Sequence, residues 1–382
     1  MRVLHINAGN MFGGVETILT TLARSRALTP DVEPEFALCF AGRLSAELAA
    51  AGVPVHMLGE VRVRYPLTLM RARRRLREIL SSGTYDVVVC HMAWTQALFG
   101  SVARASRVPV AMWQHMASNG RHWLEQWARY SGPDLVICTS HFAAREFSGV
   151  FSAVPVEVVH CPVAAPSISY SPSDRNAVRS ELTTPADSVV VIHTGRMEPL
   201  KGHRLLMQAA SIIKSNSQWI IWLVGGAQRE SEDNYLASLH STARESGIED
   251  RIRFTGQRND VDRLLAASDI HCQPNSSPDA FGIGFIEALY AGLPVVTTQL
   301  GGALEIVNDS CGVTVAPNDP IALAAALGRL VGDPEARRRL GNAGPARARV
   351  LCDPQRQMDL LRKTLLNLGG ARRSFASSRA AR

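Results

Sequence analysis

The stretch DAFGIGFIEALYAGLPVV, residues 279–296, decides the fold class and opens the search for a site. It begins as a loop, turns into a helical pattern from about Gly282 to Tyr290, and ends that helix at AGLP before the strand PVVTT. A helix that leads directly into an apolar, β-branched strand is half of a repeating βα unit. The stretch therefore predicts a parallel sheet covered by helices.

The same unit recurs on both sides of this stretch. Strand patterns in the first half are RVLHI, PEFALCF, PVHML, YDVVVCH, VPVAMW, DLVICTS and VEVVH, and those in the second half are SVVVIHTG, WIIWLVGG, IRFTG, DIHCQP, LPVVTT and GVTVAP. Helical patterns such as GVETILTTLARSRAL lie between them. The sequence thus predicts an α/β protein with two Rossmann-like parallel-sheet domains that face a cleft.

A segment rich in proline and serine, residues 161–174, interrupts the alternation and marks the boundary between the two domains. We predict an N-terminal domain over residues 1–165 and a C-terminal domain over residues 166–355. A C-terminal helix over residues 356–370 is expected to pack back on the N-terminal domain. Residues 371–382 are basic and rich in small residues, which predicts a disordered tail.

The composition argues against several classes of protein. No apolar run approaches the ~18–20 residues that span a bilayer, and the polar start MRVLHINAGN does not fit a signal peptide, so we expect a cytoplasmic protein. The 7 cysteines form no Cys-x-x-Cys pair and the 11 histidines no His-x-x-x-His pair, so a structural metal is not expected. No cofactor is expected either. The net charge of +7 favours an anionic partner.

Two carboxylates of the opening stretch, Asp279 and Glu287, could form an acid–base pair, a metal site or the ends of a binding site. Asp279 precedes the helix and Glu287 lies about a turn and a half inside it. An acid–base pair around one bond needs carboxyl groups ~5–9.5 Å apart. The observed spacing suits an elongated ligand, whose anionic part the amides of Phe281, Gly282 and Ile283 could bind. The alternative for Glu287 is a charge on the helix surface, which its apolar neighbours disfavour.

Two other loops follow predicted strands. GRMEPLKG carries Arg196 and Lys201, and two cations at the carboxyl end of a strand suit a diphosphate; the alternative is a pair of solvated loop cations. NAGNMFGGVE carries Gly13 and Gly14 just before a helix, where glycine lets the backbone approach an anionic ligand. The alternative for these glycines is a tight turn that only starts the helix.

Together, GRMEPLKG, DAFGIGFIEALYAGLPVV and the following GGALEIV resemble the donor-binding signature of the family 4 glycosyltransferases of the GT-B fold. The likeness extends from GGVE near the N-terminus to LCDPQRQMDLLRKTLLNL. It implies transfer of a sugar from a nucleotide-diphosphate donor to a hydroxyl acceptor, with retention and without a metal, in polysaccharide, glycolipid or natural-product glycoside synthesis. A nucleotide-sugar epimerase of similar architecture is the alternative enzyme, although the sequence displays no dedicated acid–base residues for it.

The resemblance also assigns roles to single residues. Arg196 and Lys201 match the pair that binds the diphosphate, and Glu287 matches the glutamate that binds the ribose. Asp279 replaces the family's longer glutamate near the reacting carbon of the sugar. His115 in AMWQHM matches a histidine that faces the donor sugar; without the resemblance, a buried hydrogen-bonded core histidine is the better interpretation.

The remaining matches concern the backbone. Arg258 in FTGQRND borders the base, Gly14 lies near the phosphate, and the segment from Phe281 to Ile283 holds sugar and phosphate. The implied catalytic residues are His115, Asp279, Arg196 and Lys201. The implied donor-binding residues are Gly13, Gly14, Arg196, Lys201, Arg258, Asp279, Phe281, Gly282, Ile283 and Glu287.

The acceptor is expected to bind the N-terminal domain, where GEVRVRYP places Arg62, Arg64 and Tyr65 in a loop. The helix LTLMRARRRLREIL follows, with one apolar face and one face dense in arginine. Two interpretations stay open: an anionic or lipid-linked acceptor with peripheral contact to an acidic membrane, or an ordinary sheet-covering helix with a solvated basic side. Nucleic-acid binding is the non-enzymatic alternative, but the sequence lacks a recognised module, so no nucleic-acid partner is expected.

Overall fold

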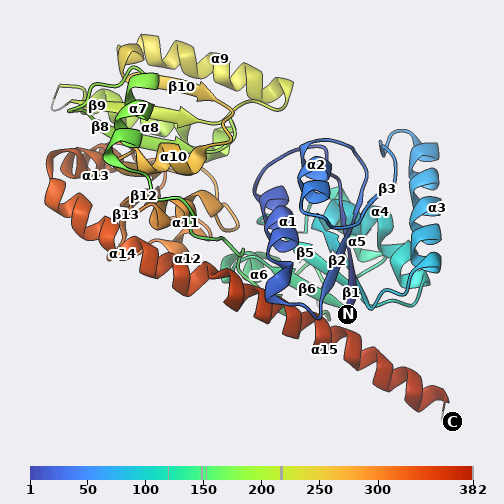
Figure 1. Cartoon of the computed structure of the whole chain (residues 1–382). Helices are drawn as coiled ribbons and strands as arrows, with labels where there is room; N and C mark the ends of the chain where they lie inside the picture. Colours follow the sequence, from blue (N-terminus) through green and yellow to red (C-terminus); the bar gives the residue numbers. More distant parts are fainter. Residues whose placement is uncertain (119, 148, 152, 216–217, 381–382) are drawn as a thin grey trace. The chain divides into compact units, whose positions relative to one another are not determined.

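The computed structural model describes residues 1–382 except 119, 148, 152, 216–217 and 381–382, and only the backbone of residues 371–380. Within these residues the chain forms one sheet of seven strands and one of six, each paired in parallel (Figure 1). The predicted α/β class with two Rossmann-like parallel-sheet domains is thereby confirmed. The chain divides into an N-terminal unit, Met1–Ala164 with Cys352–Arg382, and a C-terminal unit, Ala165–Leu351. The boundaries predicted from the sequence, 165/166 and 355/356, lie close to these observed divisions at 164/165 and 351/352.

The sheet of the N-terminal unit has the order β3-β2-β1-β4-β5-β6-β7. Its strands are β1 (Arg2–Asn7), β2 (Glu33–Leu38), β3 (Val55–Met57), β4 (Val87–His91), β5 (Val110–Gln114), β6 (Leu135–Cys138) and β7 (Val156–Val158). Its helices are α1 (Gly14–Arg24), η1 (Arg26–Leu28), α2 (Arg43–Ala50), α3 (Pro66–Ser82), α4 (Met92–Ala105), α5 (Trp123–Arg129), α6 (His141–Phe147) and α15 (Pro354–Ala380).

Alternate residues along these strands point to opposite faces of the sheet. Leu4 and Ile6 of β1 and Val88 and Cys90 of β4 join the apolar faces of α3 and α4 in one buried core. The side chains between them, such as His5 on β1, therefore belong to the other face of the sheet. This alternation matters below, because it gathers polar side chains in the opposite layer.

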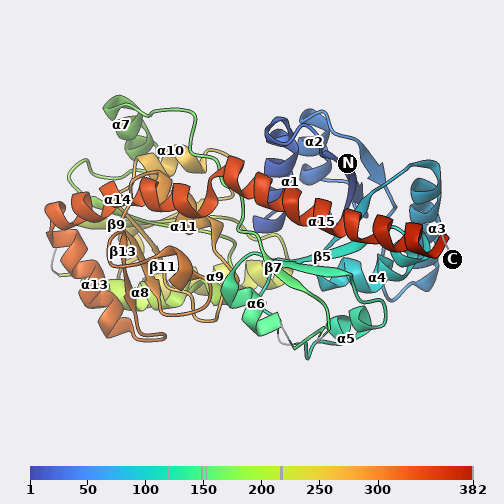
Figure 2. The ribbon, with the colours of Figure 1, turned by 90° about the horizontal axis from the view of Figure 1, so that it is seen from below.

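The C-terminal helix α15 packs on the N-terminal unit (Figure 2). Arg362 pairs with Asp31, with 2.7 Å between Nε and a carboxylate oxygen, and Gln355 donates to the carbonyl of Leu28. The backbone of α15 continues to Ala380, into the tail at 371–382 for which the sequence predicts disorder; the side chains of this tail and residues 381–382 lie outside the described residues. In the part of the chain that the structure describes, no helix combines the length and apolar character needed to cross a bilayer.

The sheet of the C-terminal unit has the order β10-β9-β8-β11-β12-β13. Its strands are β8 (Val189–Thr194), β9 (Trp219–Val224), β10 (Ile252–Gly256), β11 (Ile270–Gln273), β12 (Val295–Thr298) and β13 (Gly312–Val315). Its helical elements are α7 (Pro172–Glu181), η2 (Pro199–Lys201), α8 (His203–Ile212), α9 (Glu230–Glu245), η3 (Glu249–Arg251), α10 (Val261–Ala266), α11 (Ile283–Tyr290), α12 (Ala303–Ile306), α13 (Pro320–Gly332) and α14 (Pro334–Cys352).

The central strands of this sheet are buried along almost their whole length, because helices cover both faces. WIIWLV of β9 is buried at every position, and VVVIHT of β8 at every position after the first. Since both strands are parallel, their carboxyl ends lie at the same edge of the sheet, where ligands of open α/β sheets bind. The loop after β8 carries GRMEPLKG, so the fold places the predicted diphosphate-binding loop at this edge.

Candidate active site

The helix α11 begins at Ile283, next to the predicted start at Gly282. Gly282 caps it with φ +106°, a conformation that glycine adopts without strain. The preceding loop is fixed by Gly302, whose amide donates to the carbonyl of Asp279 at 2.9 Å. A Cβ at Gly302 would lie 2.1 Å from the carbonyl oxygen of Ala280, so the two backbones can be this close only with glycine there. The GGALEIV motif thus holds the loop that enters α11.

The structure brings two of the predicted residues into direct contact. The Nζ of Lys201 on η2 lies 2.6 Å from a carboxylate oxygen of Asp279, and both side chains are largely buried. The other carboxylate oxygen of Asp279 accepts from the amide of Ala280 at 2.8 Å. A ligand that binds Lys201 through a phosphate must therefore share this cation with Asp279.

Arg196, on the loop after β8, is held by two carboxylates. Its guanidinium lies 2.6 Å from Glu198 and 2.9 Å from Glu232, a buried residue of α9. Glu232 also accepts from the amide of Gln228 at 2.8 Å. Sequence reasoning missed both glutamates; Glu198, within GRMEPLKG itself, could have been found from its spacing, but Glu232 is brought near only by the fold. These pairs contradict the alternative of a freely solvated loop cation at Arg196.

Glu287 lies half-buried on α11, between the buried side chains of Ile286 and Ala288. Burial, and the nearby charge of Asp262, raise the pKa of its carboxyl group to about 7. In the residues that the structure describes, neither a hydrogen bond nor an ion pair reaches this carboxylate. An unpaired carboxyl group in such a place differs from an ordinary surface charge, and hydroxyl donors of a ligand could satisfy it.

The guanidinium of Arg258 is already occupied. It contacts Asp260 at 2.8 Å and Glu181 at 2.7 Å, and these hydrogen bonds raise its pKa further. If the segment FTGQRND contacts a ligand, its backbone is therefore better placed to do so than the side chain of Arg258. Phe281, another predicted backbone contact, has a buried side chain.

In the N-terminal unit, Gly13 and Gly14 stand at the start of α1 as predicted. The amide of Gly13 donates to the carboxylate of Glu16 at 3.0 Å, which also accepts from Asn7 at 3.3 Å. Glu16 is buried and ties the end of β1 to the loop. Sequence reasoning missed it, although its position three residues after Gly13 follows the spacing of a capping box.

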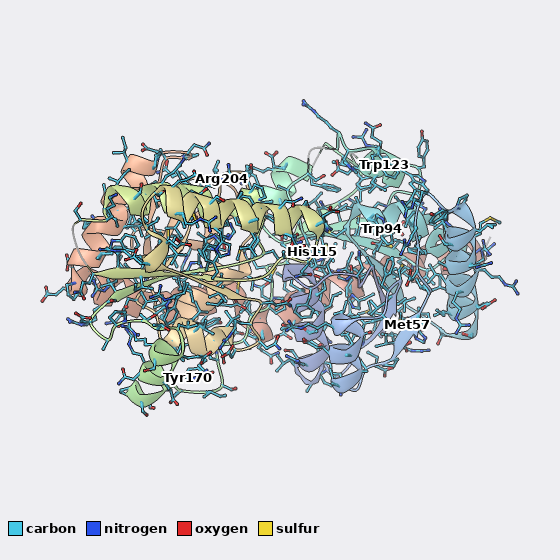
Figure 3. All side chains as sticks on the ribbon, turned by 90° about the horizontal axis from the view of Figure 1, so that it is seen from above. Met57, Trp94, His115, Trp123, Tyr170 and Arg204 are labelled. Atoms are coloured by element: carbon cyan, nitrogen blue, oxygen red, sulfur yellow. The ribbon has the colours of Figure 1, made fainter. Side chains whose placement is uncertain are left out.

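His115 follows directly after β5 and is buried (Figure 3). Its Nε2 lies 2.9 Å from Nδ1 of His91, while its Nδ1 is buried without a hydrogen-bond partner among the described residues. Burial lowers the pKa of His115 to about 3, so the ring is neutral at physiological pH. Nε2 is hydrogen-bonded, as a core histidine requires, whereas Nδ1 still lacks a hydrogen-bond partner among the described residues.

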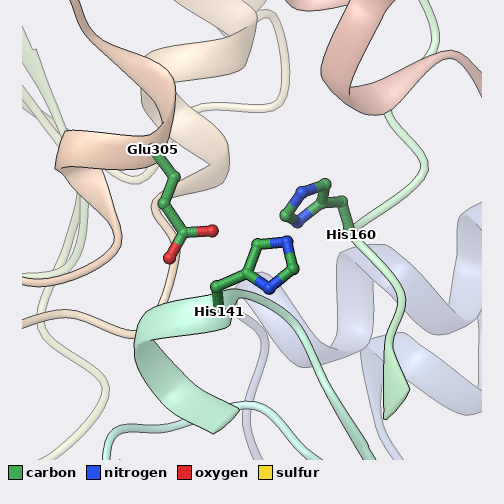
Figure 4. Close-up of side chains that lie close together, drawn as sticks. All are labelled: His141, His160 and Glu305. Atoms are coloured by element: carbon green, nitrogen blue, oxygen red, sulfur yellow. The ribbon is translucent and has the colours of Figure 1, made fainter. Parts of the chain in front are cut away.

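The predicted acceptor-side residues lie in the loop between β3 and α3. Arg62 and Arg64 are exposed, and the guanidinium of Arg64 stands 5.0 Å from the ring centre of Tyr65. At the carboxyl edge of the same sheet, His141 and His160 meet edge to face with their ring centres 6.0 Å apart (Figure 4). Sequence reasoning missed this histidine pair, because its members are far apart in the chain.

The chain matches two described families. Residues 12–165 match "Glycosyltransferase Family 4", and residues 174–347 match "Glycosyl transferases group 1". The chain is 27% identical to a D-inositol 3-phosphate glycosyltransferase from Acidothermus cellulolyticus, over 78% of this chain and 68% of that protein. It is 28% identical to the lipopolysaccharide core biosynthesis glycosyltransferase LpsD from Rhizobium meliloti, over 90% and 92% of the two chains.

The fold is also similar to that of HepE from Anabaena, solved in complex with UDP-glucose. The TM-score is 0.84 at 23% identity, and the alignment covers 96% of this chain and 100% of that one. The curated relatives named here are glycosyltransferases, which does not favour the epimerase alternative. The two family matches and the similarity in fold show that this chain belongs to the family 4 glycosyltransferases of the GT-B fold.

Proposed function

We propose that this glycosyltransferase takes its sugar from a nucleoside diphosphate sugar and transfers it to a hydroxyl acceptor with retention of configuration. The observation that carries the proposal is the cluster formed by Arg196, Lys201 and the start of α11 at the carboxyl edge of the sheet. Arginine, lysine and helix amides together match the charge of a diphosphate. The UDP-glucose bound by HepE makes a UDP-sugar the first candidate donor.

In the proposed reaction, the bond between the anomeric carbon and the diphosphate oxygen breaks, and the diphosphate leaves with the electron pair. The acceptor oxygen forms the new bond on the same face of the sugar and passes its proton to the leaving diphosphate. Lys201, Arg196 and the amides of Gly282 and Ile283 stabilise the charge that develops on the leaving diphosphate. We propose that these groups do so without a metal.

The other site residues keep the roles that the resemblance implies. Glu287 accepts from ribose hydroxyls, Asp279 contacts hydroxyls of the transferred sugar, and His115 faces that sugar. Gly14 lets the phosphate approach, and the segment of Arg258 borders the base. We propose these roles for the residues where the structure places them, together with Gly13, Phe281, Gly282 and Ile283 as backbone contacts.

A screen of UDP-, GDP-, ADP- and TDP-sugars by thermal shift and by slow hydrolysis tests the proposal. A true donor at about 100 times its Kd stabilises the folded state by ~2.7 kcal/mol, which is readily seen. The same screen with a chelator tests metal independence, since turnover should persist. Absence of both stabilisation and hydrolysis with all four nucleotides would refute the donor class.

Asp279→Glu is expected to keep activity but change the preferred sugar. The longer carboxylate can still reach Lys201, yet it meets the sugar hydroxyls at a different depth. We expect the ratio of kcat/KM for two sugars on the same nucleotide to change by about tenfold, because polar contacts to hydroxyls discriminate strongly. A correctly folded but inactive variant would contradict this explanation.

Glu287 should make stability and nucleotide binding depend on pH. Its pKa is about 7 in the folded chain against 4.5 for a free glutamate, so the unfolded chain loses this proton first. The folded state therefore loses stability as the pH rises from about 4.5 to about 7, by on the order of 1–3 kcal/mol. Glu287→Gln should remove this slope in urea unfolding at pH 5 and pH 8.

Ribose hydroxyls should bind the ionised form of Glu287, so the affinity for UDP should rise with pH through about 7 more steeply in the wild type than in Glu287→Gln. The terminal phosphate of UDP titrates near pH ~6 in both proteins and contributes equally to both slopes. Glu335→Gln, a change at an exposed glutamate of α14, serves as the control. Equal slopes for the wild type and Glu287→Gln would rule out the titration of this group as the cause.

We further propose that the acceptor is anionic or lipid-linked and that the start of α3 touches an acidic membrane surface. Val63, Tyr65, Leu67 and Met70 expose apolar surface there, with Leu67 at 65% and Met70 at 64%. The buried face of α3 packs on the sheet, as expected of an ordinary sheet-covering helix. The four exposed apolar residues lie outside that face. Apolar side chains beside arginines are typical of peripheral membrane contacts.

Four exposed arginines of α3 provide the test: Arg71, Arg74, Arg75 and Arg77. Arg73 is excluded because its Nε donates to the carbonyl of Leu98 at 2.7 Å. Changing all four to glutamine should weaken co-sedimentation with phosphatidylglycerol vesicles by at least about 100-fold, given ~1 kcal/mol for each basic residue. The control is the same change at four exposed arginines of the C-terminal unit, Arg204, Arg244, Arg339 and Arg349. Equal binding by all three proteins would exclude the membrane contact.

A further inference from the structure

Three neighbouring strands of the N-terminal unit place three imidazole rings in a row. His5 lies on β1, His91 ends β4, and His115 follows β5, and these strands are adjacent in the sheet. Nδ1 of His5 lies 3.0 Å from Nε2 of His91, and Nδ1 of His91 lies 2.9 Å from Nε2 of His115. Both ring nitrogens of His91 are thus used within this histidine chain.

The rings are buried and held in orientation by aromatic neighbours. His5 stacks on Phe36 with ring centres 5.3 Å apart, and Trp113 stacks on both His91 and His115 at 5.6 and 5.2 Å. His5 is 2%, His91 0% and His115 9% exposed, so bulk water has little access to the two hydrogen bonds. A ring fixed in this way cannot rotate to find another partner.

Burial lowers the pKa of all three histidines far below neutrality, so each ring carries a single N–H at physiological pH. If His91 donates from Nδ1 to His115, its Nε2 must accept from Nδ1 of His5, and the proton of His115 is on Nδ1. If His91 donates from Nε2 to His5, its Nδ1 must accept from Nε2 of His115, and Nδ1 of His115 is bare. Any mixed arrangement places two lone pairs or two N–H groups face to face.

The two allowed arrangements therefore share one tautomer among all three rings, either all Nδ1–H or all Nε2–H. They differ at the end of the chain, where Nδ1 of His115 is buried without a partner among the described residues. In the first arrangement this atom offers an N–H, and in the second it offers a lone pair. A change from one to the other moves protons within the chain and leaves its net charge unchanged.

We propose that His5 and His91 are positioning residues for the glycosyl transfer, because their shared tautomer decides whether Nδ1 of His115 donates to, or accepts from, a hydroxyl of the donor sugar. The part of this proposal that concerns the sugar rests on the proposed function, in which His115 faces that sugar. The part that concerns the coupled tautomers rests only on the geometry of the three rings. A histidine that is held in the wrong tautomer by its neighbour loses its function although it stays in place.

The first experiment is nitrogen NMR of the full chain with 15N-labelled histidine, without any ligand. Single substitutions assign the signals of the three rings. We expect His5, His91 and His115 to show the same tautomer, and His115 to change its ratio of tautomers in His5→Phe, although it does not touch that residue. Different tautomers in the three wild-type rings, or a His115 signal unaffected by His5→Phe, would overturn the coupling.

The second experiment compares two substitutions of the middle ring. His91→Asn keeps a polar group near the position of Nδ1 and so keeps a partner for His115, whereas His91→Gln keeps one near Nε2 and leaves His115 alone. With the donor found in the nucleotide screen, we expect kcat of His91→Gln to fall about tenfold or more with KM nearly unchanged, and that of His91→Asn to fall less.

A merely structural role of His91 gives a different result. Activity would then follow the melting temperature, and two variants of equal stability would have equal kcat, which would overturn the positioning role. If no nucleotide sugar is turned over at all, the proposed function fails, and the NMR measurement still decides whether the tautomers are coupled. The two failures are therefore distinguishable.

Discussion

Replacing Lys201 with alanine is expected to lower kcat/KM for the nucleotide sugar by about 100- to 1000-fold, the usual loss when one donor to a developing negative charge is removed. The ammonium group lies 2.6 Å from Asp279 and is largely buried, so its position is fixed before the ligand arrives. Water that replaces it can offer hydrogen bonds but no charge. Arg196→Ala should cause a loss of similar size, because Glu198 and Glu232 hold that guanidinium equally firmly.

Two controls distinguish the loss of a cation at the diphosphate from a general loss of positive charge and from the unpaired carboxylate that Lys201→Ala leaves behind. Arg204→Ala removes an exposed cation three residues further along and should leave kcat/KM unchanged (Figure 3). The double variant Lys201→Ala with Asp279→Ala removes the carboxylate that the first change leaves unpaired. Recovery of activity in the double variant, or near-normal rates in both single variants, would show that the cations do not bind the diphosphate.

Gly202→Ala is expected to destabilise the C-terminal unit by about 3–5 kcal/mol, a fall of roughly 6–20 °C in Tm. Gly202 has φ +76°, and a Cβ there would lie 1.7 Å from the carbonyl oxygen of Pro274. Neither backbone can move easily, because this glycine joins η2, with Lys201, to the first turn of α8. A variant that still folds should carry a displaced Lys201 and therefore turn over poorly.

Gly256→Ala is the matched control for stability. Gly256 lies in the same unit and also has a positive φ, +68°, but a Cβ there would meet open space. Gly256→Ala should therefore lose only ~1–2 kcal/mol of stability, which is the cost of the left-handed conformation for residues other than glycine. Equal melting temperatures for the two variants would mean that the contact with Pro274 relaxes without cost.

Much of the fold could be predicted from local patterns. The apolar runs of β8 and β9 and the AGLP that ends α11 are signals carried by neighbouring residues, and they gave the right elements in the right order. The resemblance also pointed to Lys201 and Asp279 as members of one site, although they are far apart in the chain. The resemblance could not predict the direct ion pair between these two side chains, because that pair depends on how closely the loop before α11 approaches η2.

The parts of the site that escaped prediction depend on contacts across the sheet. Glu232 reaches Arg196 from a different helix, and no spacing in the sequence connects the two. The histidine chain is a similar case: His5 lies within an ordinary strand pattern, His91 ends one and His115 follows one, and only the strand order β1-β4-β5 makes them neighbours. Sequence reasoning saw His115 alone and therefore had to choose between a core histidine and a ligand contact.

The return of α15 to the N-terminal unit makes the C-terminal unit an insertion within the other one. Its residues, Ala165–Leu351, form one continuous piece, whereas the N-terminal unit is assembled from two separate pieces of chain. A cut after residue 164 would therefore remove the partner of Asp31 and leave one unit incomplete. Exchanging residues 165–351 as one cassette would leave both units of this chain whole, which makes it the natural segment for testing whether the C-terminal unit carries the donor specificity proposed above.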